Sequence, residues 1–127
     1  MEGVKYFDHA ATTKLDEQVL NEMLPYLLEN YGNASALYSL GRTAKEGILL
    51  SKMRVAASIN CNTNEVYFTS GGSESDNLAI KGIAIANSRF GNHIITTKIE
   101  HPAVLNTCKS LEKIGYKVTY LPVDDLR

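Results

Sequence analysis

Residues 65–82 read EVYFTSGGSESDNLAIKG, and this stretch decides the fold. Residues 66–69 form a short β-rich run that predicts a buried strand. Four small residues follow, and residues 74–86 then have the apolar spacing of a helix. A strand, a small-residue turn and a helix in this order present free backbone N–H groups and the helix dipole to an anion, above all a phosphate. The alternative is a plain strand–helix connection with a serine N-cap and no ligand.

The small-residue turn differs from the well-known nucleotide motifs. Residues 70–73, SGGS, fit neither the Walker A pattern nor G-x-G-x-x-G. ATP and dinucleotides are therefore not indicated. Glycine lets the backbone approach a ligand closely, and Ser70 and Ser73 add hydroxyl donors.

Two helices are predicted before this stretch. Asp16 has the position of an N-cap, and Gly32 that of a left-handed C-terminal cap. The second helix is expected over residues 38–59, and residues 6–7 are expected to form a brief strand. The apolar face of the first helix comprises Val19, Leu20, Met23, Leu24, Leu27 and Leu28.

After residues 65–82, strands and helices alternate. Strands are predicted over residues 93–99 and 116–123, and a helix over residues 103–114, with Pro102 in its first turn. Gly115 is the expected cap of that helix, and Cys108 is expected to pack in the core. The order helix–helix–(β-α-β-α-β) predicts an α/β fold with mostly parallel strands.

Composition excludes several classes of protein. The chain has 127 residues and a net charge of −1, which suits one domain with a hydrophobic core. It has no basic block, so neither nucleic acid nor an anionic membrane is an expected partner. No apolar run approaches the ~20 residues of a membrane span, and residues 1–13 lack the apolar region of a signal peptide, so a cytoplasmic location is expected. Cys61 and Cys108 have no metal-ligand spacing, so no metal site is expected.

Three loops are candidates for a functional site: residues 8–13, 70–73 and 100–101. The second and third loops follow the carboxyl ends of predicted strands, where open α/β sheets bind their ligands. His101 could stack on a planar ring or transfer a proton there. The alternative for His101 is a helix-capping or merely exposed histidine before a proline.

The sequence resembles the N-terminal third of the NifS/IscS-type cysteine desulfurases, class V aminotransferase-like enzymes of PLP fold type I. The matching segments occur in the family's order and spacing along the whole chain. They are YFDHAATT (residues 6–13), GNAS (32–35), GR (41–42), FTSGGSESDNLAIKG (68–82) and EHPAVL (100–105).

The resemblance implies a role for each candidate loop. Gly72 and Ser73 stand where the family has the Ala-Thr pair that binds the phosphate of pyridoxal 5′-phosphate (PLP). His101 stands where the family's histidine stacks on the pyridine ring and takes part in proton transfer. Ala10, Ala11 and Thr12 correspond to a turn on the substrate side.

The resemblance also implies an activity and an assembly. The intact enzyme would convert L-cysteine to L-alanine and an enzyme-bound persulfide, for iron–sulfur clusters or thiolation, and it would be a homodimer. Residues 1–127 would be the N-terminal part of the major domain, with residues 1–15 on the small-domain side. The fold type places the strand at residues 67–69 at the opposite edge of the sheet from the strand at residues 93–99.

The printed sequence does not contain the family's Schiff-base site. That lysine follows a histidine in the family, whereas the three histidines here precede Ala10, Ile94 and Pro102. These residues therefore contain no family-equivalent lysine to which PLP could be attached covalently. We expect this chain alone to be an inactive fragment. We also expect it either to self-associate or to need a partner chain that supplies the rest of the fold. Two alternatives stay open: a non-catalytic or split subunit that works with a partner chain, and a related PLP enzyme such as a selenocysteine lyase.

Overall fold

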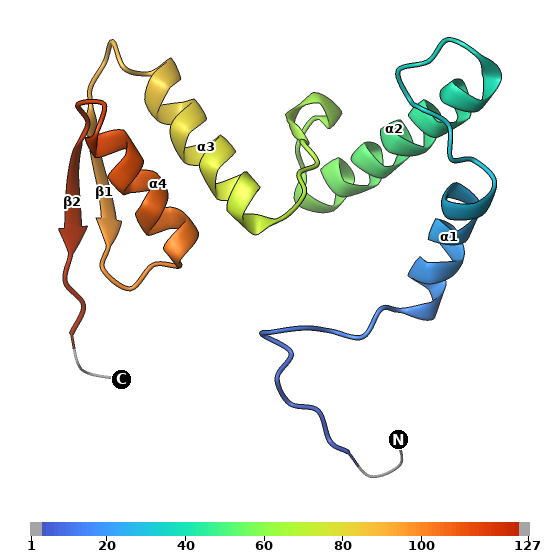
Figure 1. Ribbon diagram of the computed structural model, residues 1–127, viewed down its shortest axis with the longest axis horizontal. Helices are drawn as coiled ribbons and strands as arrows, with labels where there is room; N and C mark the ends of the chain where they lie inside the picture. Colours follow the sequence, from blue (N-terminus) through green and yellow to red (C-terminus); the bar gives the residue numbers. More distant parts are fainter. Residues whose placement is uncertain (1–3, 125–127) are drawn as a thin grey trace. The chain divides into compact units, whose positions relative to one another are not determined.

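Four α-helices, one 3-10 turn and a parallel pair of strands make up residues 4–124, which are the residues that the computed structural model describes (Figure 1). The chain divides into two compact units, Met1–Tyr67 (unit 1) and Phe68–Arg127 (unit 2). The predicted α/β class is confirmed, because the strands are parallel and are connected by a helix.

Unit 1 contains α1 (Glu17–Leu28), α2 (Ser39–Ile59) and the 3-10 turn η1 (Thr63–Glu65). The predicted N-cap of α1 is confirmed, since Asp16 Oδ1 accepts the N–H of Gln18 at 2.8 Å. Helix α1 meets α2 where the Tyr26 ring lies over Gly47, at which a Cβ atom would fall 2.5 Å from the ring. Glycine at this position therefore lets the two helices approach closely.

Two predictions for unit 1 are wrong. Residues 6–7 form no strand, since no neighbouring strand is present among the described residues of this unit to pair with them. Gly32 is not a left-handed cap: α1 ends at Leu28, and among the described glycines it is Gly115 that has a left-handed φ, of +99°. Gly32 is required for space instead, because a Cβ there would lie 2.5 Å from the backbone oxygen of Leu40.

Unit 2 contains α3 (Gly72–Ala86), β1 (His93–Thr97), α4 (Pro102–Glu112) and β2 (Lys117–Leu121). Strands β1 and β2 pair in parallel, in a register that sets His93 opposite Lys117 and Thr97 opposite Leu121. Helix α4 connects them and packs against α3. The Tyr116 hydroxyl donates to the backbone oxygen of Ala84 at 2.9 Å, which fixes the start of β2 to α3.

The core of unit 2 lies on α4. Thr107, Cys108 and Leu111 are each 1–2% exposed, which confirms the predicted burial of Cys108. The Thr107 hydroxyl donates to the backbone oxygen of Ala103 at 2.7 Å, so this buried polar group is satisfied. Gly115 adopts a φ of +99° in the turn that leads to β2, as its predicted capping role requires.

The strand predicted at residues 66–69 does not form. Val66 is extended and buried, but Tyr67 and Phe68 are 70% and 53% exposed, and neither β1 nor β2 pairs with this segment. A strand needs a hydrogen-bonding neighbour, and within residues 4–124 this segment has none. Helix α3 also begins two residues earlier than predicted, and β1 and β2 are shorter than their predicted ranges.

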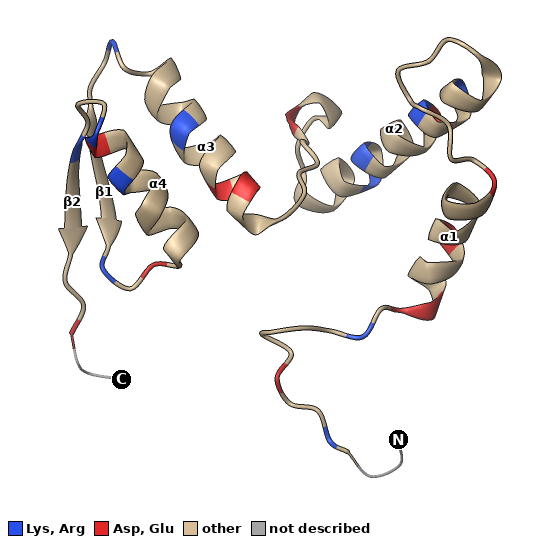
Figure 2. Ribbon diagram, viewed as in Figure 1, with Lys and Arg blue, Asp and Glu red and all other residues tan. Residues whose placement is uncertain are grey.

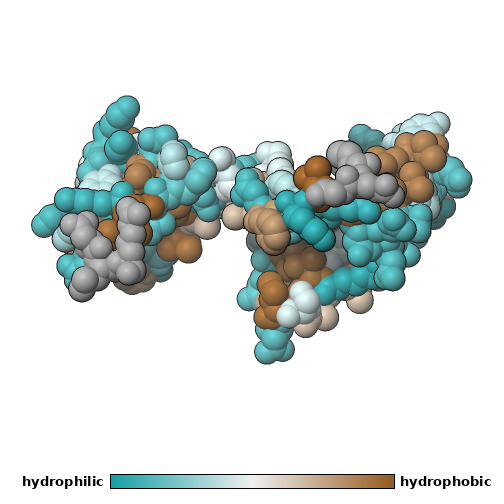
Figure 3. Space-filling view, turned by 90° about the horizontal axis from the view of Figure 1, so that it is seen from below, coloured by the Kyte–Doolittle hydropathy of each residue, from teal (hydrophilic) through white to brown (hydrophobic). Residues whose placement is uncertain are grey.

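Many apolar side chains lie on the surface of each unit (Figure 3). On α1 they include Leu27 and Leu28, and on α3 they include Leu78, Ile83 and Ile85. No helix among residues 4–124 combines the length and the apolar character that crossing a membrane would require.

Candidate functional site

Hydroxyl groups fix the loop between residue 69 and the first turn of α3. The Thr69 and Ser75 hydroxyls lie 2.6 Å apart and share a hydrogen bond, and each also contacts the backbone oxygen of Gly71 at 3.3 Å. The Ser75 N–H donates to the same oxygen at 3.1 Å, which closes the first helical turn. The loop that carries the predicted phosphate-binding residues is therefore fixed by Thr69, which precedes it, and by Ser75, which follows it.

Glu74 holds the other part of this loop. One oxygen of its carboxylate accepts the backbone N–H of Ser70 at 2.7 Å and the Ser70 hydroxyl at 2.6 Å. The hydroxyl, and next the backbone N–H, lower the pKa of the Glu74 carboxyl below its ordinary value. Glu74 is thus ionised at neutral pH and engaged with Ser70, in a variant of the capping box.

The first N–H groups of α3 are left open. Gly71 is the N-cap and supplies no side-chain acceptor, and residues 4–124 provide no hydrogen-bond partner for the N–H groups of Gly72 and Ser73. A Cβ atom placed on either glycine would meet nothing within 4 Å. A ligand can therefore reach these N–H groups directly, and the helix dipole favours an anion there.

These residues fit the phosphate group of PLP. The site offers backbone N–H groups, the Ser73 hydroxyl and the positive end of a 15-residue helix. Two acidic residues, Glu74 and Asp76, belong to the first turns of α3, and Figure 2 shows red at this end of the helix. The Glu74 carboxylate contacts Ser70, and it therefore leaves the N–H groups of Gly72 and Ser73 available.

His101 is the N-cap of α4. Its backbone is extended (φ −56°, ψ 146°), and its ring Nδ1 accepts the N–H of Ala103 at 3.1 Å. Pro102 occupies the first helical position, where its missing N–H is tolerated. The capping role that sequence left open for His101 is thus present, while the residue remains exposed and able to contact a ligand.

The predicted cofactor-binding residues all belong to unit 2. Helices α3 and α4 pack together and run in the same direction, so their N-termini lie at the same end of the unit as the carboxyl end of β1 (Figure 1). Gly72, Ser73 and His101 are thereby placed at one end of the unit. This is the edge at which parallel α/β sheets bind ligands.

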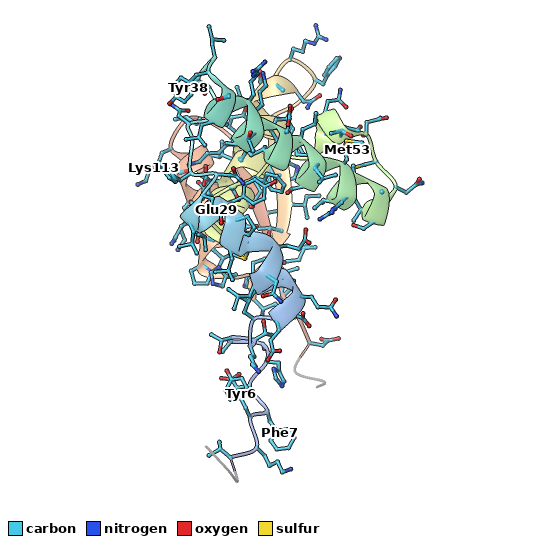
Figure 4. All side chains as sticks on the ribbon, turned by 90° about the vertical axis from the view of Figure 1, so that its right-hand side faces the viewer. Tyr6, Phe7, Glu29, Tyr38, Met53 and Lys113 are labelled. Carbon is cyan, nitrogen blue, oxygen red and sulfur yellow. The ribbon has the colours of Figure 1, made fainter. Side chains whose placement is uncertain are left out.

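The predicted substrate-side turn belongs to unit 1. The N–H groups of Ala11 and Thr12 donate to the backbone oxygen of Asp8 at 3.1 and 3.3 Å, which makes a tight turn through Ala10. The Tyr6 hydroxyl donates to the same oxygen at 2.8 Å and lies 2.6 Å from the Thr12 hydroxyl. Figure 4 shows Tyr6 and Phe7 on the segment that precedes α1.

Sequence reasoning missed the roles of Glu74 and Thr69. A glutamate three residues after the N-cap was the available signal for Glu74, because this is the spacing of a capping box. Nothing comparable marks Thr69. The expectation that Cys61 and Cys108 bind no metal stays a prediction; among residues 4–124, no group of three or more histidine, cysteine or acidic side chains could hold an ion.

Residues 5–127 match the family model described as "Aminotransferase class-V". The chain therefore belongs to the class V aminotransferase family. Among its relatives is the "Cysteine desulfurase IscS" of Clostridium botulinum (strain Hall), which is 58% identical over 120 residues. The protein of the same name from Methanosarcina thermophila is 55% identical over 119 residues. In both cases the match covers 94% of this chain and 30% of the relative, so the chain spans about a third of the length of these proteins.

Solved structures give the same family resemblance. The structure titled "NIFS-LIKE PROTEIN" matches with a TM-score of 0.85 and 40% identity, over 94% of this chain and 33% of that one. "SspA in complex with cysteine" matches with a TM-score of 0.83 and 42% identity, over 93% of this chain and 34% of the other. The resemblance to NifS/IscS-type proteins that the sequence motifs indicated is confirmed.

Proposed function

We propose that this sequence forms part of a PLP-dependent cysteine desulfurase and supplies the cradle for the cofactor's phosphate. Gly72 and Ser73 bind the phosphate through their N–H groups and the Ser73 hydroxyl. His101 covers the cofactor ring. Ala10, Ala11 and Thr12 line the substrate side of the complete site.

Bound PLP would supply an electron sink for bonds at the substrate's α-carbon. The residues of this chain would bind and orient the cofactor. The two loop anchors, Thr69 with Ser75 and Glu74 with Ser70, hold the cradle in place before the phosphate arrives, so little ordering remains for the binding step.

L-Cysteine is the substrate we propose. Relatives that are 55–58% identical are named cysteine desulfurases, and a structural neighbour was solved in complex with cysteine. In the complete enzyme the sulfur atom would leave cysteine for an enzyme thiol, which would yield L-alanine and a persulfide. Cys108 does not suit that role, because it is 1% exposed and burial raises the pKa of its thiol.

One observation carries the proposal: the open N–H groups at the start of α3 share an end of unit 2 with His101. A titration followed by amide NMR tests it, with PLP, inorganic phosphate and pyridoxal, which has no phosphate. The amides of Gly71, Gly72, Ser73 and Glu74 should shift first with PLP and phosphate and stay still with pyridoxal. If these amides stay still at millimolar PLP while others move, the assignment of the cradle is wrong.

Matched serine variants refine the test. Ser73→Ala removes a hydroxyl at the cradle and should weaken phosphate binding about tenfold, as expected for one hydrogen bond to a charged group. Ser88→Ala removes a hydroxyl just beyond the other end of α3 and should leave binding unchanged. Equal effects of the two variants would contradict the proposed cradle.

Activity is measured on the gene product that contains this sequence, as L-alanine released from L-cysteine in the presence of PLP. The proposal expects alanine and sulfur in equal amounts. If the protein saturated with PLP converts a different amino acid and releases no alanine from cysteine, the proposed substrate is refuted.

A further inference from the structure

The ring of His101 has one nitrogen whose role the backbone fixes. Nδ1 lies 3.1 Å from the backbone nitrogen of Ala103 and accepts its N–H as the cap of α4. A backbone N–H is only ever a donor, so Nδ1 must offer its lone pair. In a neutral imidazole with Nδ1 as acceptor, the proton is on Nε2.

We infer that the fold holds His101 as its Nε2–H tautomer, so that it presents a hydrogen-bond donor, and not a basic nitrogen, to whatever lies against Nε2. Within residues 4–124 the structure gives Nε2 no partner, and the side chain is exposed. The neighbouring Glu100 carboxylate is engaged elsewhere, since it accepts the Thr97 hydroxyl at 2.9 Å.

The other two histidines show that this constraint is specific. His93 Nε2 lies 2.7 Å from the Thr119 hydroxyl, which can donate or accept, so that contact allows both tautomers. His9 and the Tyr6 ring are perpendicular, with ring centroids 5.2 Å apart, and among residues 4–124 no hydrogen bond fixes either ring nitrogen of His9. Both histidines therefore serve as internal controls.

The inference rests on the proposed function only for the identity of the group that His101 faces. In the proposed site, His101 stacks on the cofactor ring and can donate from Nε2 to an oxygen or another acceptor of the cofactor or substrate. Its one lone pair on nitrogen is already bound to α4. The Nε2–H group is therefore the part of the ring that remains to contact a ligand.

The tautomer is read directly from a long-range ¹H–¹⁵N correlation spectrum of the labelled 127-residue chain. The measurement is repeated at rising pH until the spectrum no longer changes, so that only neutral rings contribute. His101, assigned by the loss of its signals in H101N, should show a nearly pure Nε2–H pattern, whereas His9 should show the mixture of a free ring. An Nδ1–H pattern, or a mixture like that of His9, would overturn the inference.

Amide hydrogen exchange at Ala103 gives a second, independent measurement. H101A removes the cap and should speed exchange of the Ala103 amide about fivefold over H101N, whose side chain can still accept that N–H. H93A should leave the Ala103 amide unchanged. Equal exchange in H101A and H101N would contradict the cap. If H101A does not fold, the spectrum of the unmodified chain still decides the question.

Neither measurement uses PLP or activity. A mixed tautomer together with phosphate binding at Gly72 and Ser73 would therefore refute this inference and leave the proposed function standing. A pure Nε2–H tautomer without phosphate binding would refute the proposed function and leave this inference standing.

Discussion

Gly41→Ala should destabilise α2, although alanine favours a helix more than glycine does. Gly41 is buried in the first turn of α2, and a Cβ there would lie 2.5 Å from the backbone oxygen of Ala36 and 2.6 Å from that of Asn33. Carbon–oxygen contacts are normally about 3.3–3.6 Å, so two backbone oxygens would have to move by about 0.8 Å. The Ala36 N–H to Asn33 oxygen bond, 2.9 Å long, opposes that movement.

The magnitude follows from two opposing effects. Overpacking costs about 1–3 kcal/mol, and the upper end applies here because the clashing atoms are backbone. The gain in helix propensity is at most about 1 kcal/mol, which leaves a net loss of about 2 kcal/mol. The matched control is Gly82→Ala in α3, where a Cβ meets nothing within 4 Å and a gain of about 1 kcal/mol is expected.

Amide hydrogen exchange measures the local stability of α2 and of α3 separately in one experiment. Gly41→Ala should speed exchange along α2 by about thirtyfold, and Gly82→Ala should slow it along α3 by about fivefold; these factors correspond to about 2 and 1 kcal/mol at ~1.4 kcal/mol per tenfold. Unchanged or slower exchange in α2 of Gly41→Ala would refute the reasoning. It would mean that the turn at residues 33–36 moves aside at little cost.

Three further predictions concern the loop, the thiols and the surface. The lowered pKa of Glu74 means that its contribution to stability is present above its ordinary value of 4.5 and is lost as pH falls through the lower folded value. Urea unfolding should therefore show Glu74→Gln to be less stable than the native chain at neutral pH and equally stable at strongly acid pH. Iodoacetamide should modify half-buried Cys61 before Cys108, which is buried and whose pKa is raised by burial and then by the Glu112 and Glu100 carboxylates. The exposed apolar side chains of both units should drive self-association, visible as a mass that rises with concentration in light scattering.

Each of these predictions has a clear contrary outcome. A difference between Glu74→Gln and the native chain that stays the same at every pH would show that the charge of Glu74 plays no part. Equal rates of alkylation under native conditions, read by mass spectrometry with Cys61→Ser as the control, would show that Cys108 is accessible. A constant monomeric mass across a wide concentration range would show that the apolar surfaces do not associate.

Local signals in the sequence predicted the helices well. The N-cap at Asp16, the proline at the start of α4 and the left-handed Gly115 each follow from the chemistry of one or two neighbouring residues. The parallel pairing of β1 and β2 followed from the strand–helix–strand order.

Features that depend on distant residues could not be predicted in the same way. The segment at residues 66–69 has the composition of a strand, but pairing requires a neighbour that composition does not specify. Gly32 fits a cap in sequence, yet the structure uses it for close contact with Leu40, a constraint that arises only from packing. For His101, sequence offered two roles as alternatives, whereas the capping contact occupies one ring nitrogen and leaves the other free.

The choice of glycine at position 71 connects the stability of α3 with ligand binding. Gly71 is extended, with a φ of 165° that any residue can adopt, so backbone strain does not require glycine there. Gly71→Asp would supply the missing cap and should stabilise α3 by about 0.5 kcal/mol, through the cap and the helix dipole.

The same carboxylate would occupy the N–H groups that we assign to the phosphate and would repel it. Gly71→Asp should therefore raise the urea midpoint and abolish the phosphate-induced shifts of Gly72 and Ser73, while Gly71→Ser, a cap without charge, should weaken them less. Unchanged phosphate binding in Gly71→Asp would mean that the phosphate lies elsewhere. Under the proposed function, Gly71 serves the phosphate because it places no capping side chain on the N–H groups of Gly72 and Ser73.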